Sequence, residues 1–311
     1  MMMDSGIATD GSRLFTRFFD AVDMIGSFPA AATLAEVNAI AAGHGLRFPL
    51  VIDLDRTLRE HLAVAEYAPA SARFGAYVDN LPGMNWLLPT GRRVRIGERV
   101  VKSTTGYDLF RFLLHSDGRY GQATDYVLRL RPVGGESFAV AFTGDAGALA
   151  AVRRRLMASS WNHWIDRIDQ VSVAGSPPRI EAEVDCLAGE KPRFLAFFAA
   201  VAGESGTGMV EASGVASPGL PAFSIKSTPA RVAELSAICA GRLGGQARAL
   251  LLNGVVLVYP DNPPDAAFLA DLGRSLEPLG GHLLGPSLPP RDPIPAEAIW
   301  AASLNHQWNA L

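Results

Sequence analysis

Hydrophobic and polar positions change rhythm along the chain, and the change divides it into two parts. Thr33 followed by Glu36 forms a capping box ahead of the apolar positions Val37, Ile40 and Ala41, which predicts a helix ending near Gly43. Residues 83–88 and 94–96 are predicted to form two strands joined by a Pro89-Thr90-Gly91 turn. Apolar and polar residues alternate again at 126–131, which predicts another strand. The segment 132–135, Pro-Val-Gly-Gly, then breaks the pattern.

The second part alternates strands with helices. Strands are predicted at 137–142, 180–186, 223–226 and 282–284, and helices at 145–158, 191–202 and 265–279. Thr228 with Pro229 predicts the start of another helix. Asn253-Gly254 between the runs 249–252 and 255–258 predicts a hairpin with a type I′ turn. This pattern favours a ferredoxin-like α+β sheet with helices on one face, and no internal repeat is evident.

Composition narrows the class of protein. The chain has 311 residues, of which 49% are hydrophobic and 19% charged, so two domains with substantial cores are expected. A net charge of −3 argues against general affinity for nucleic acid. No segment reads as a signal peptide or as a membrane span, which predicts a cytoplasmic protein. Cys186 and Cys239 stand far apart, so neither a disulfide framework nor a metal ribbon is expected.

The first part carries a series of specific motifs. The segment 100–109 reads Val-Val-Lys-Ser-Thr-Thr-Gly-Tyr-Asp-Leu, and 115–121 reads His-Ser-Asp-Gly-Arg-Tyr-Gly. The strand that follows ends in Leu-Arg-Leu-Arg-Pro at 128–132, and Arg73-Phe74-Gly75 lies upstream. In sequence, order and spacing these motifs resemble the FAD-linked oxidases related to vanillyl-alcohol oxidase, which have a PCMH-type FAD-binding domain. The likeness covers about residues 28–132 and is greatest to the shorter flavin-type subunit of glycolate oxidase.

The resemblance implies a fold and a division of the chain. Residues 1–133 would form a truncated PCMH-type FAD-binding domain consisting of the second subdomain only. Residues 134–290 would form the ferredoxin-like cap domain, and 291–311 a C-terminal helix. The implied cofactor is FAD and the implied substrate is a 2-hydroxy acid. If FAD binds, the positions implied as its contacts are Ser71, Gly75, Asp79, Gly106, Tyr107, Ser116 and Gly118.

The sequence departs from the family where FAD demands bare backbone. The family has a Thr-x-Gly-Gly stretch, and the corresponding residues here are Thr57, Leu58, Arg59 and Glu60. Ionic side chains therefore occupy both glycine positions, and Glu60 adds a negative charge beside a diphosphate. From the resemblance we also expect the first subdomain, with its glycine-rich phosphate loop, to be missing. We therefore expect a degenerate FAD site, with FAD binding doubtful.

Three functions remain open on these grounds. The first is a subunit of a flavin-dependent 2-hydroxy-acid (glycolate-type) dehydrogenase or oxidase complex, beside a partner subunit that carries the flavin. The second is an active FAD-dependent oxidoreductase that completes its site with another chain. The third is a non-enzymatic binding or regulatory protein that uses the emptied cleft. The catalytic residues are not identified by any of these readings.

Two other patterns favour structural roles. His163, Asp166 and Asp169 have the spacing H-x-x-D-x-x-D, but they lie among Trp161, Trp164 and other apolar residues, so an amphipathic element is preferred to a metal site. Residues 203–208 are glycine-rich but lack the ending of a phosphate loop, so a flexible connector is expected. The exposed or buried state of the tryptophans stays open, because they would suit either a partner interface or the core.

Overall fold

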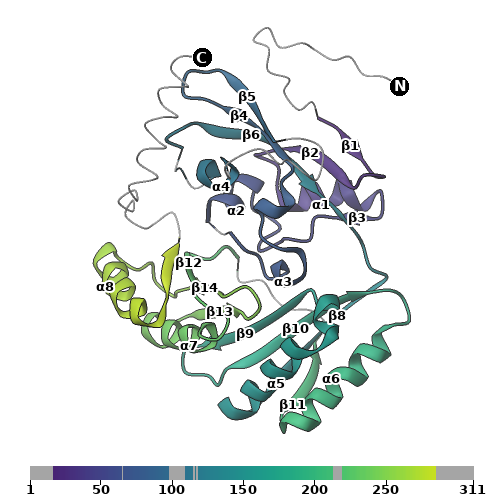
Figure 1. Cartoon of the computed structure of the whole chain (residues 1–311), viewed down its shortest axis with the longest axis vertical. Coiled ribbons are helices and arrows are strands. Elements are labelled where there is room, and N and C mark those ends of the chain that lie inside the picture. Colours follow the sequence, from purple (N-terminus) through teal and green to yellow (C-terminus); the bar gives the residue numbers. More distant parts are fainter. Residues whose placement is uncertain are drawn as a thin grey trace.

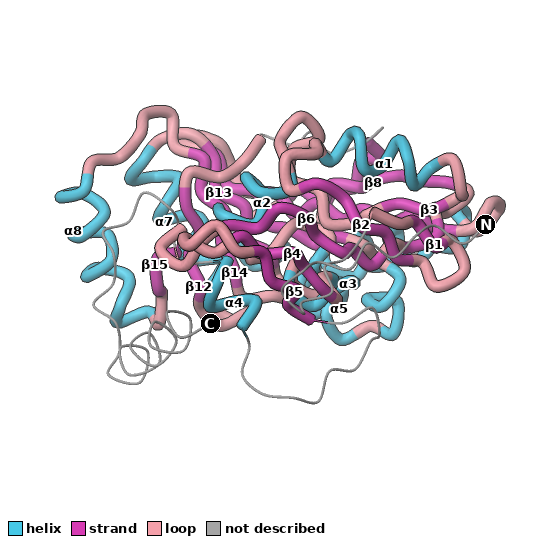
Figure 2. Tube along the Cα trace, turned by 90° about the horizontal axis from the view of Figure 1, so that it is seen from above, coloured by secondary structure: helices cyan, strands magenta, loops and turns pink. Residues whose placement is uncertain are grey.

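The computed structural model describes residues 17–64, 66–97, 109–114, 116, 118–212 and 219–284. The chain forms two halves, each built on its own antiparallel sheet (Figure 1). It passes from the first sheet to the second between Pro132 and Glu136. Seen from above, α7 and α8 lie at one end of the molecule and α1 and β1 at the other (Figure 2).

The first half has a five-stranded sheet in the order β1-β2-β6-β4-β5, together with a two-stranded pair β3-β7. Its strands are β1 (Phe19–Asp20), β2 (Ile25–Pro29), β3 (Leu46–Arg47), β4 (Gly83–Leu87), β5 (Arg93–Gly97), β6 (Gln122–Arg129) and β7 (Arg131–Pro132). Its helices are α1 (Leu34–Ala42), α2 (Leu58–Val64), α3 (Ser71–Phe74), η1 (Val78–Asn80) and α4 (Leu109–Leu114).

The capping box predicted for α1 is confirmed. The Thr33 hydroxyl accepts from the Glu36 N–H at 3.2 Å, and the Glu36 carboxylate accepts from the Thr33 N–H at 2.8 Å. These bonds satisfy donors that a helix start leaves unpaired. Leu34, Val37 and Ala41 then face the core of the first half, as the apolar spacing requires.

The second half has one eight-stranded sheet in the order β11-β8-β10-β9-β13-β14-β12-β15. Its strands are β8 (Glu136–Thr143), β9 (Arg167–Val173), β10 (Arg179–Cys186), β11 (Gly208–Ala212), β12 (Phe223–Lys226), β13 (Gln246–Leu250), β14 (Val255–Tyr259) and β15 (His282–Leu284). Its helices are α5 (Ala146–Ala158), η2 (Ser160–Trp164), α6 (Lys191–Ser205), α7 (Val232–Leu243), α8 (Ala266–Leu276) and η3 (Glu277–Leu279).

The topology of the second half repeats, although its sequence does not. β8-α5-β9-β10-α6-β11 and β12-α7-β13-β14-α8-β15 are both β-α-β-β-α-β units. Each unit places its fourth strand at one edge, next to its first, and the units join through β9 and β13. Because only the order of elements is shared, reading the sequence for repeats did not find the duplication.

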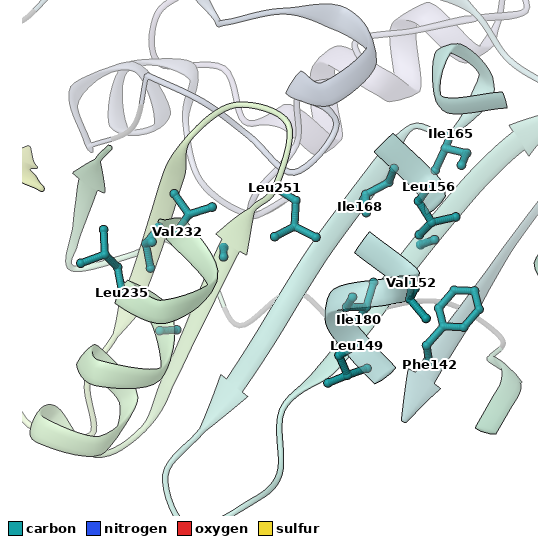
Figure 3. Packing of buried hydrophobic residues seen from close by; sticks show 14 of the residues in the cluster. Phe142, Leu149, Val152, Leu156, Ile165, Ile168, Ile180, Val232, Leu235 and Leu251 are labelled. Atoms are coloured by element: carbon teal, nitrogen blue, oxygen red, sulfur yellow. The ribbon is translucent and has the colours of Figure 1, made fainter. Parts of the chain in front are cut away.

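Helices α5 to α8 cover one face of this sheet. Leu149, Val152 and Leu156 of α5 pack towards Phe142 and Ile180 of the sheet (Figure 3). Val232 and Leu235 of α7 extend the same core over the second unit (Figure 3). The opposite face of β9, β10, β13 and β14 is therefore free of these helices and is turned towards the first half (Figure 1).

Three local predictions were wrong. The β13–β14 hairpin exists, but four residues connect its strands and only Gly254 has a positive φ, so the turn is not type I′. The N–H groups of Asn253 and Gly254 donate to the Leu250 carbonyl and close this longer turn. Helix α7 begins at Val232 rather than after Thr228, and Gly203 to Ser205 continue α6 instead of forming a connector.

No helix within the described ranges is both long enough and apolar enough to cross a bilayer. The C-terminal helix predicted over 291–311 lies outside the described residues.

Candidate functional site

The candidate site is the start of α2, where the two family glycines are replaced. Thr57 and Glu60 form a second capping box that the sequence reading did not identify. The Glu60 carboxylate accepts from the N–H and from the hydroxyl of Thr57, at 2.8 and 2.9 Å. In return the Glu60 N–H donates to the Thr57 hydroxyl at 3.2 Å. The hydrogen bonds from Thr57 lower the pKa of Glu60, and the charge of Arg56 adds to them.

Every backbone N–H from Thr57 to His61 donates within the chain. Leu58 and Arg59 donate to the carbonyls of Ala32 and Ala30, at 2.9 and 3.0 Å. His61 donates to the carbonyl of Thr57, while Thr57 and Glu60 are joined by their capping box. A phosphate bound at a helix start is held by N–H groups that point at it unpaired. At this helix start those groups already have acceptors.

Arg59 occupies the other family glycine position. Its guanidinium reaches across to the first sheet and donates to the carbonyl of Ala123 on β6 at 3.0 Å. The stretch thus carries a guanidinium and a carboxylate where FAD needs bare backbone. The residues present at this contact do not fit the dinucleotide.

The segment after α2 covers the helix-free face of the second sheet. Tyr67 packs against Leu250, Val255 and Leu257 of β13 and β14. The Lys226 ammonium lies 4.3 Å from the centroid of the Tyr67 ring and donates to its hydroxyl at 3.3 Å. The Tyr67 side chain thus joins the two halves.

Three of the predicted flavin contacts lie together on α3 and η1. The Ser71 hydroxyl accepts from the Ala68 N–H at 2.9 Å, and the Asp79 carboxylate accepts from the Ala76 N–H at 2.8 Å. Gly75 has φ of +81°, and a Cβ built on it would lie 2.8 Å from the Asp79 carboxylate. These groups therefore serve the turn itself, and their role as flavin contacts stays a prediction.

The other predicted contacts fall in the segment around α4. The Ser116 hydroxyl donates to the Leu113 carbonyl at 2.7 Å, and Gly118 adopts φ of +75° in the turn that leads to β6. Gly106 and Tyr107 lie outside the described residues. Both views draw the helices α3 and α4 apart (Figures 1 and 2).

His61 is a buried residue whose role the sequence did not reveal. Its Nδ1 lies 2.9 Å from the Thr57 carbonyl, and its Nε2 lies 3.1 Å from the Asp53 N–H, from which it accepts a hydrogen bond. Because Nε2 accepts, the ring is neutral with its proton on Nδ1. Burial lowers the pKa of His61. The ring fixes the loop before α2 to the helix, in a structural role.

An ion-pair cluster joins the two halves. Asp166 accepts from Arg47 of β3 at 2.7 Å and from Arg73 of α3 at 2.5 Å. Arg47 also pairs with Asp185 at the end of β10, at 2.7 Å. The Asp166 side chain is 6% exposed, so its charge depends on these partners. We call Arg47, Arg73, Asp166 and Asp185 the seam cluster.

Asp169, the other acid of the H-x-x-D-x-x-D pattern, is also ion-paired. It lies on the sheet face turned towards the first half, beside Arg167 at 2.5 Å and Arg248 at 3.5 Å. Glu181 pairs with the same two arginines. Burial raises the pKa of Asp169 to about 6, against the opposing effect of Arg167. The side chain of His163 is not described, and the two acids face arginines rather than each other.

Comparison of the sequence with curated proteins confirms the resemblance to FAD-linked oxidoreductases. The chain is 25% identical over 158 residues to an uncharacterized FAD-linked oxidoreductase of Mycobacterium tuberculosis, covering 50% of this chain and 34% of that protein. It is 32% identical over 98 residues to the mitochondrial D-lactate dehydrogenase [cytochrome] of Arabidopsis thaliana, covering 32% and 17%. A D-lactate dehydrogenase of Archaeoglobus fulgidus is 24% identical over 130 residues, covering 42% and 29%.

These relatives are longer proteins, and the chain spans about a third of their length or less. No family model matches the sequence. Among solved structures, alkyldihydroxyacetonephosphate synthase superposes with a TM-score of 0.61 at 12% identity, over 87% of this chain and 61% of that one. The likeness in structure shows a mixed helix and sheet fold of the FAD-binding oxidase type.

Proposed function

We propose that this chain, a relative of FAD-linked oxidoreductases, is a subunit of a flavin-dependent 2-hydroxy-acid dehydrogenase or oxidase complex and holds no FAD of its own. The relatives include two D-lactate dehydrogenases, which supports a 2-hydroxy acid as the substrate of the complex. The flavin would reside on a partner subunit. In this account the second half is a ferredoxin-like cap domain, and the FAD site that it would cover in the first half is degenerate.

One observation carries the proposal. All five backbone N–H groups from Thr57 to His61 have acceptors within the chain, and the Glu60 carboxylate fills the helix start. A diphosphate or flavin there would have to displace these bonds and approach a carboxylate. Both changes oppose binding, since buried N–H groups and like charges are costly to leave uncompensated.

The rest of the fold is compatible with a subunit that acts by binding a partner subunit instead of by binding FAD. At the start of α2, groups of the chain itself accept every hydrogen bond that a bound phosphate would otherwise receive. The Tyr67 packing and the seam cluster hold the second half against the first. A movable cap that closes over a flavin is not required by this arrangement.

The proposal is tested by purifying the chain alone and together with the other subunits of the proposed complex. The isolated chain should be colourless, without the flavin absorbance at about 450 nm, and should not take up added FAD. When produced with the adjacent subunits of its complex, it should co-purify with a yellow flavin subunit. A yellow isolated chain would instead support the second alternative, in which this chain is an active FAD-dependent oxidoreductase that completes its site with another chain. A colourless chain with no flavin-carrying partner would support a binding or regulatory protein.

A further inference from the structure

Three guanidinium groups surround a single aromatic ring at the seam between the halves. The Cζ atoms of Arg47, Arg73 and Arg131 lie 5.9, 5.1 and 5.8 Å from the centroid of Phe74. Such contacts are favourable, but they do not neutralise charge. Arg47 and Arg73 are neutralised by the two aspartates of the seam cluster.

Arg131 contacts the same ring but is not ion-paired with either aspartate of the seam cluster. Its Nη2 donates to the Asn80 amide oxygen at 3.3 Å, and within the described ranges no carboxylate lies at ion-pair distance from it. Asn80 is neutral and is itself held by the carbonyls of Phe74 and Ala76. Burial lowers the pKa of Arg131, and the positive charges of Arg129 and Arg73 lower it further. The charges that act on Arg131 are thus those of other arginines.

Positive charges lie beside Arg131. Arg47 and Arg73 are matched by the carboxylates of Asp166 and Asp185, whereas Arg131 lies near Arg129 and Arg73 and forms no ion pair within the described ranges. Glu183, the next nearest acid on β10, pairs with Arg167 at 3.6 Å. A half-buried guanidinium with no counter-ion favours an anion from outside, because the attraction is less screened there than in water.

We propose that Arg131 binds the carboxylate of a small organic anion at the seam between the two halves. The planar guanidinium fork matches a carboxylate in shape and in its two acceptor oxygens. The site lies on β6 and β7, away from the start of α2, and it does not depend on a flavin subunit.

The test uses the full chain without flavin and two probes, acetate and glycolate, titrated by calorimetry. The wild-type chain should bind at millimolar concentration, and Arg131→Gln should weaken binding by about tenfold or more. Arg131→Lys should recover only part of it, since an ammonium keeps the charge and loses the fork. Arg242→Gln, which removes an exposed arginine of the second half paired with Asp271, is the matched control and should bind as wild type.

Stability separates an anion site from a structural arginine. Without carboxylate, Arg131→Gln should be at least as stable as wild type, because it relieves repulsion from Arg129 and Arg73. With carboxylate, wild type and Arg242→Gln should gain stability, Arg131→Lys should gain less, and Arg131→Gln should gain none. Equal binding by wild type and Arg131→Gln, no binding by wild type, or tighter binding of inorganic phosphate than of acetate would each overturn the proposal. Failure here leaves the flavin result unaffected, because the two experiments use different sites and probes.

Discussion

The Glu60 carboxylate closes on Thr57 through two hydrogen bonds, 2.8 Å to the backbone N–H and 2.9 Å to the hydroxyl. The residue that replaces a family glycine therefore also fills the donors of the helix start. The same substitution removes space for a cofactor and supplies a bond that the cofactor-free fold needs. This link between Thr57 and Glu60 is the basis of the functional account.

Removing the Glu60 carboxylate should destabilise the chain. Glu60→Gln weakens the capping box, and we expect a loss of about 0.5–1 kcal/mol in the free energy of unfolding, measured with urea. Because the folded pKa of Glu60 is lowered, its contribution is present above the unfolded pKa and is lost as the pH falls through the folded one. Glu234→Gln, an exposed acid in the first turn of α7, is the control. Equal stability of Glu60→Gln and wild type would contradict the capping role.

Asp166→Asn should weaken the attachment of the two halves. It leaves Arg73 without its carboxylate and Arg47 with Asp185 alone, which should cost about 3 kcal/mol for a largely buried pair. Hydrogen exchange should rise at Tyr67 and at β9. Asp271→Asn removes the exposed pairs with Arg242 and Arg274 and should cost much less than Asp166→Asn. Similar losses in the two variants would show that the seam cluster does not hold the halves together.

His61 should make stability depend on pH. Its folded pKa is lowered by burial, so protonation is less favourable in the folded state than in the unfolded chain. Stability should therefore fall as the pH drops below about 6.5 towards the folded pKa. His61→Phe keeps a ring beside Tyr77 and removes the titrating group. Its stability should change less than that of wild type over this range, and parallel curves would refute the assignment.

Two nearby glycines should differ in their tolerance of alanine. Both have positive φ, of +75° at Gly118 and +109° at Gly121. A Cβ at Gly118 would make only an ordinary contact, 3.9 Å from the Gly121 carbonyl oxygen, so Gly118→Ala should cost about 1 kcal/mol for its positive φ. A Cβ at Gly121 would collide with the Leu87 carbonyl, and Gly121→Ala should cost well above about 3 kcal/mol or prevent folding. Thermal unfolding compares them, and equal midpoints would be inconsistent with this geometry.

The sequence predicted the helix starts and strands that neighbouring residues determine. The Thr33–Glu36 capping box and the helix predicted at 145–158 appear as expected. The strands predicted in the first sheet also form, but their burial does not alternate, and β6 covers Gln122–Arg129 instead of 126–131. The start of α7 and the type of the 251–254 turn were missed: the Arg231 N–H closes a turn on the Thr228 carbonyl before the helix begins, and Asn253 and Gly254 both donate to Leu250. The Thr57–Glu60 box has the same spacing as Thr33–Glu36, so that signal was present and was read only as a loss of glycine.

The seam could not be predicted from the sequence. Arg47, Arg73 and Asp166 are separated by up to 119 positions, and no periodicity relates them. Asp166 and Asp169 were considered as metal ligands because their spacing is local, whereas their actual partners are arginines from other elements. The predicted contacts Gly106 and Tyr107 and the predicted terminal helix lie outside the described residues and remain predictions.

The most direct test is a titration of FAD into the purified chain and into the double variant Arg59→Gly/Glu60→Gly, followed by quenching of flavin fluorescence. The account predicts no uptake by wild type, because side chains and satisfied N–H groups occupy the start of α2. The double variant, provided that it unfolds cooperatively, should show measurable affinity. Stoichiometric FAD binding by the wild-type chain, equal to or tighter than that of the variant, would contradict the account.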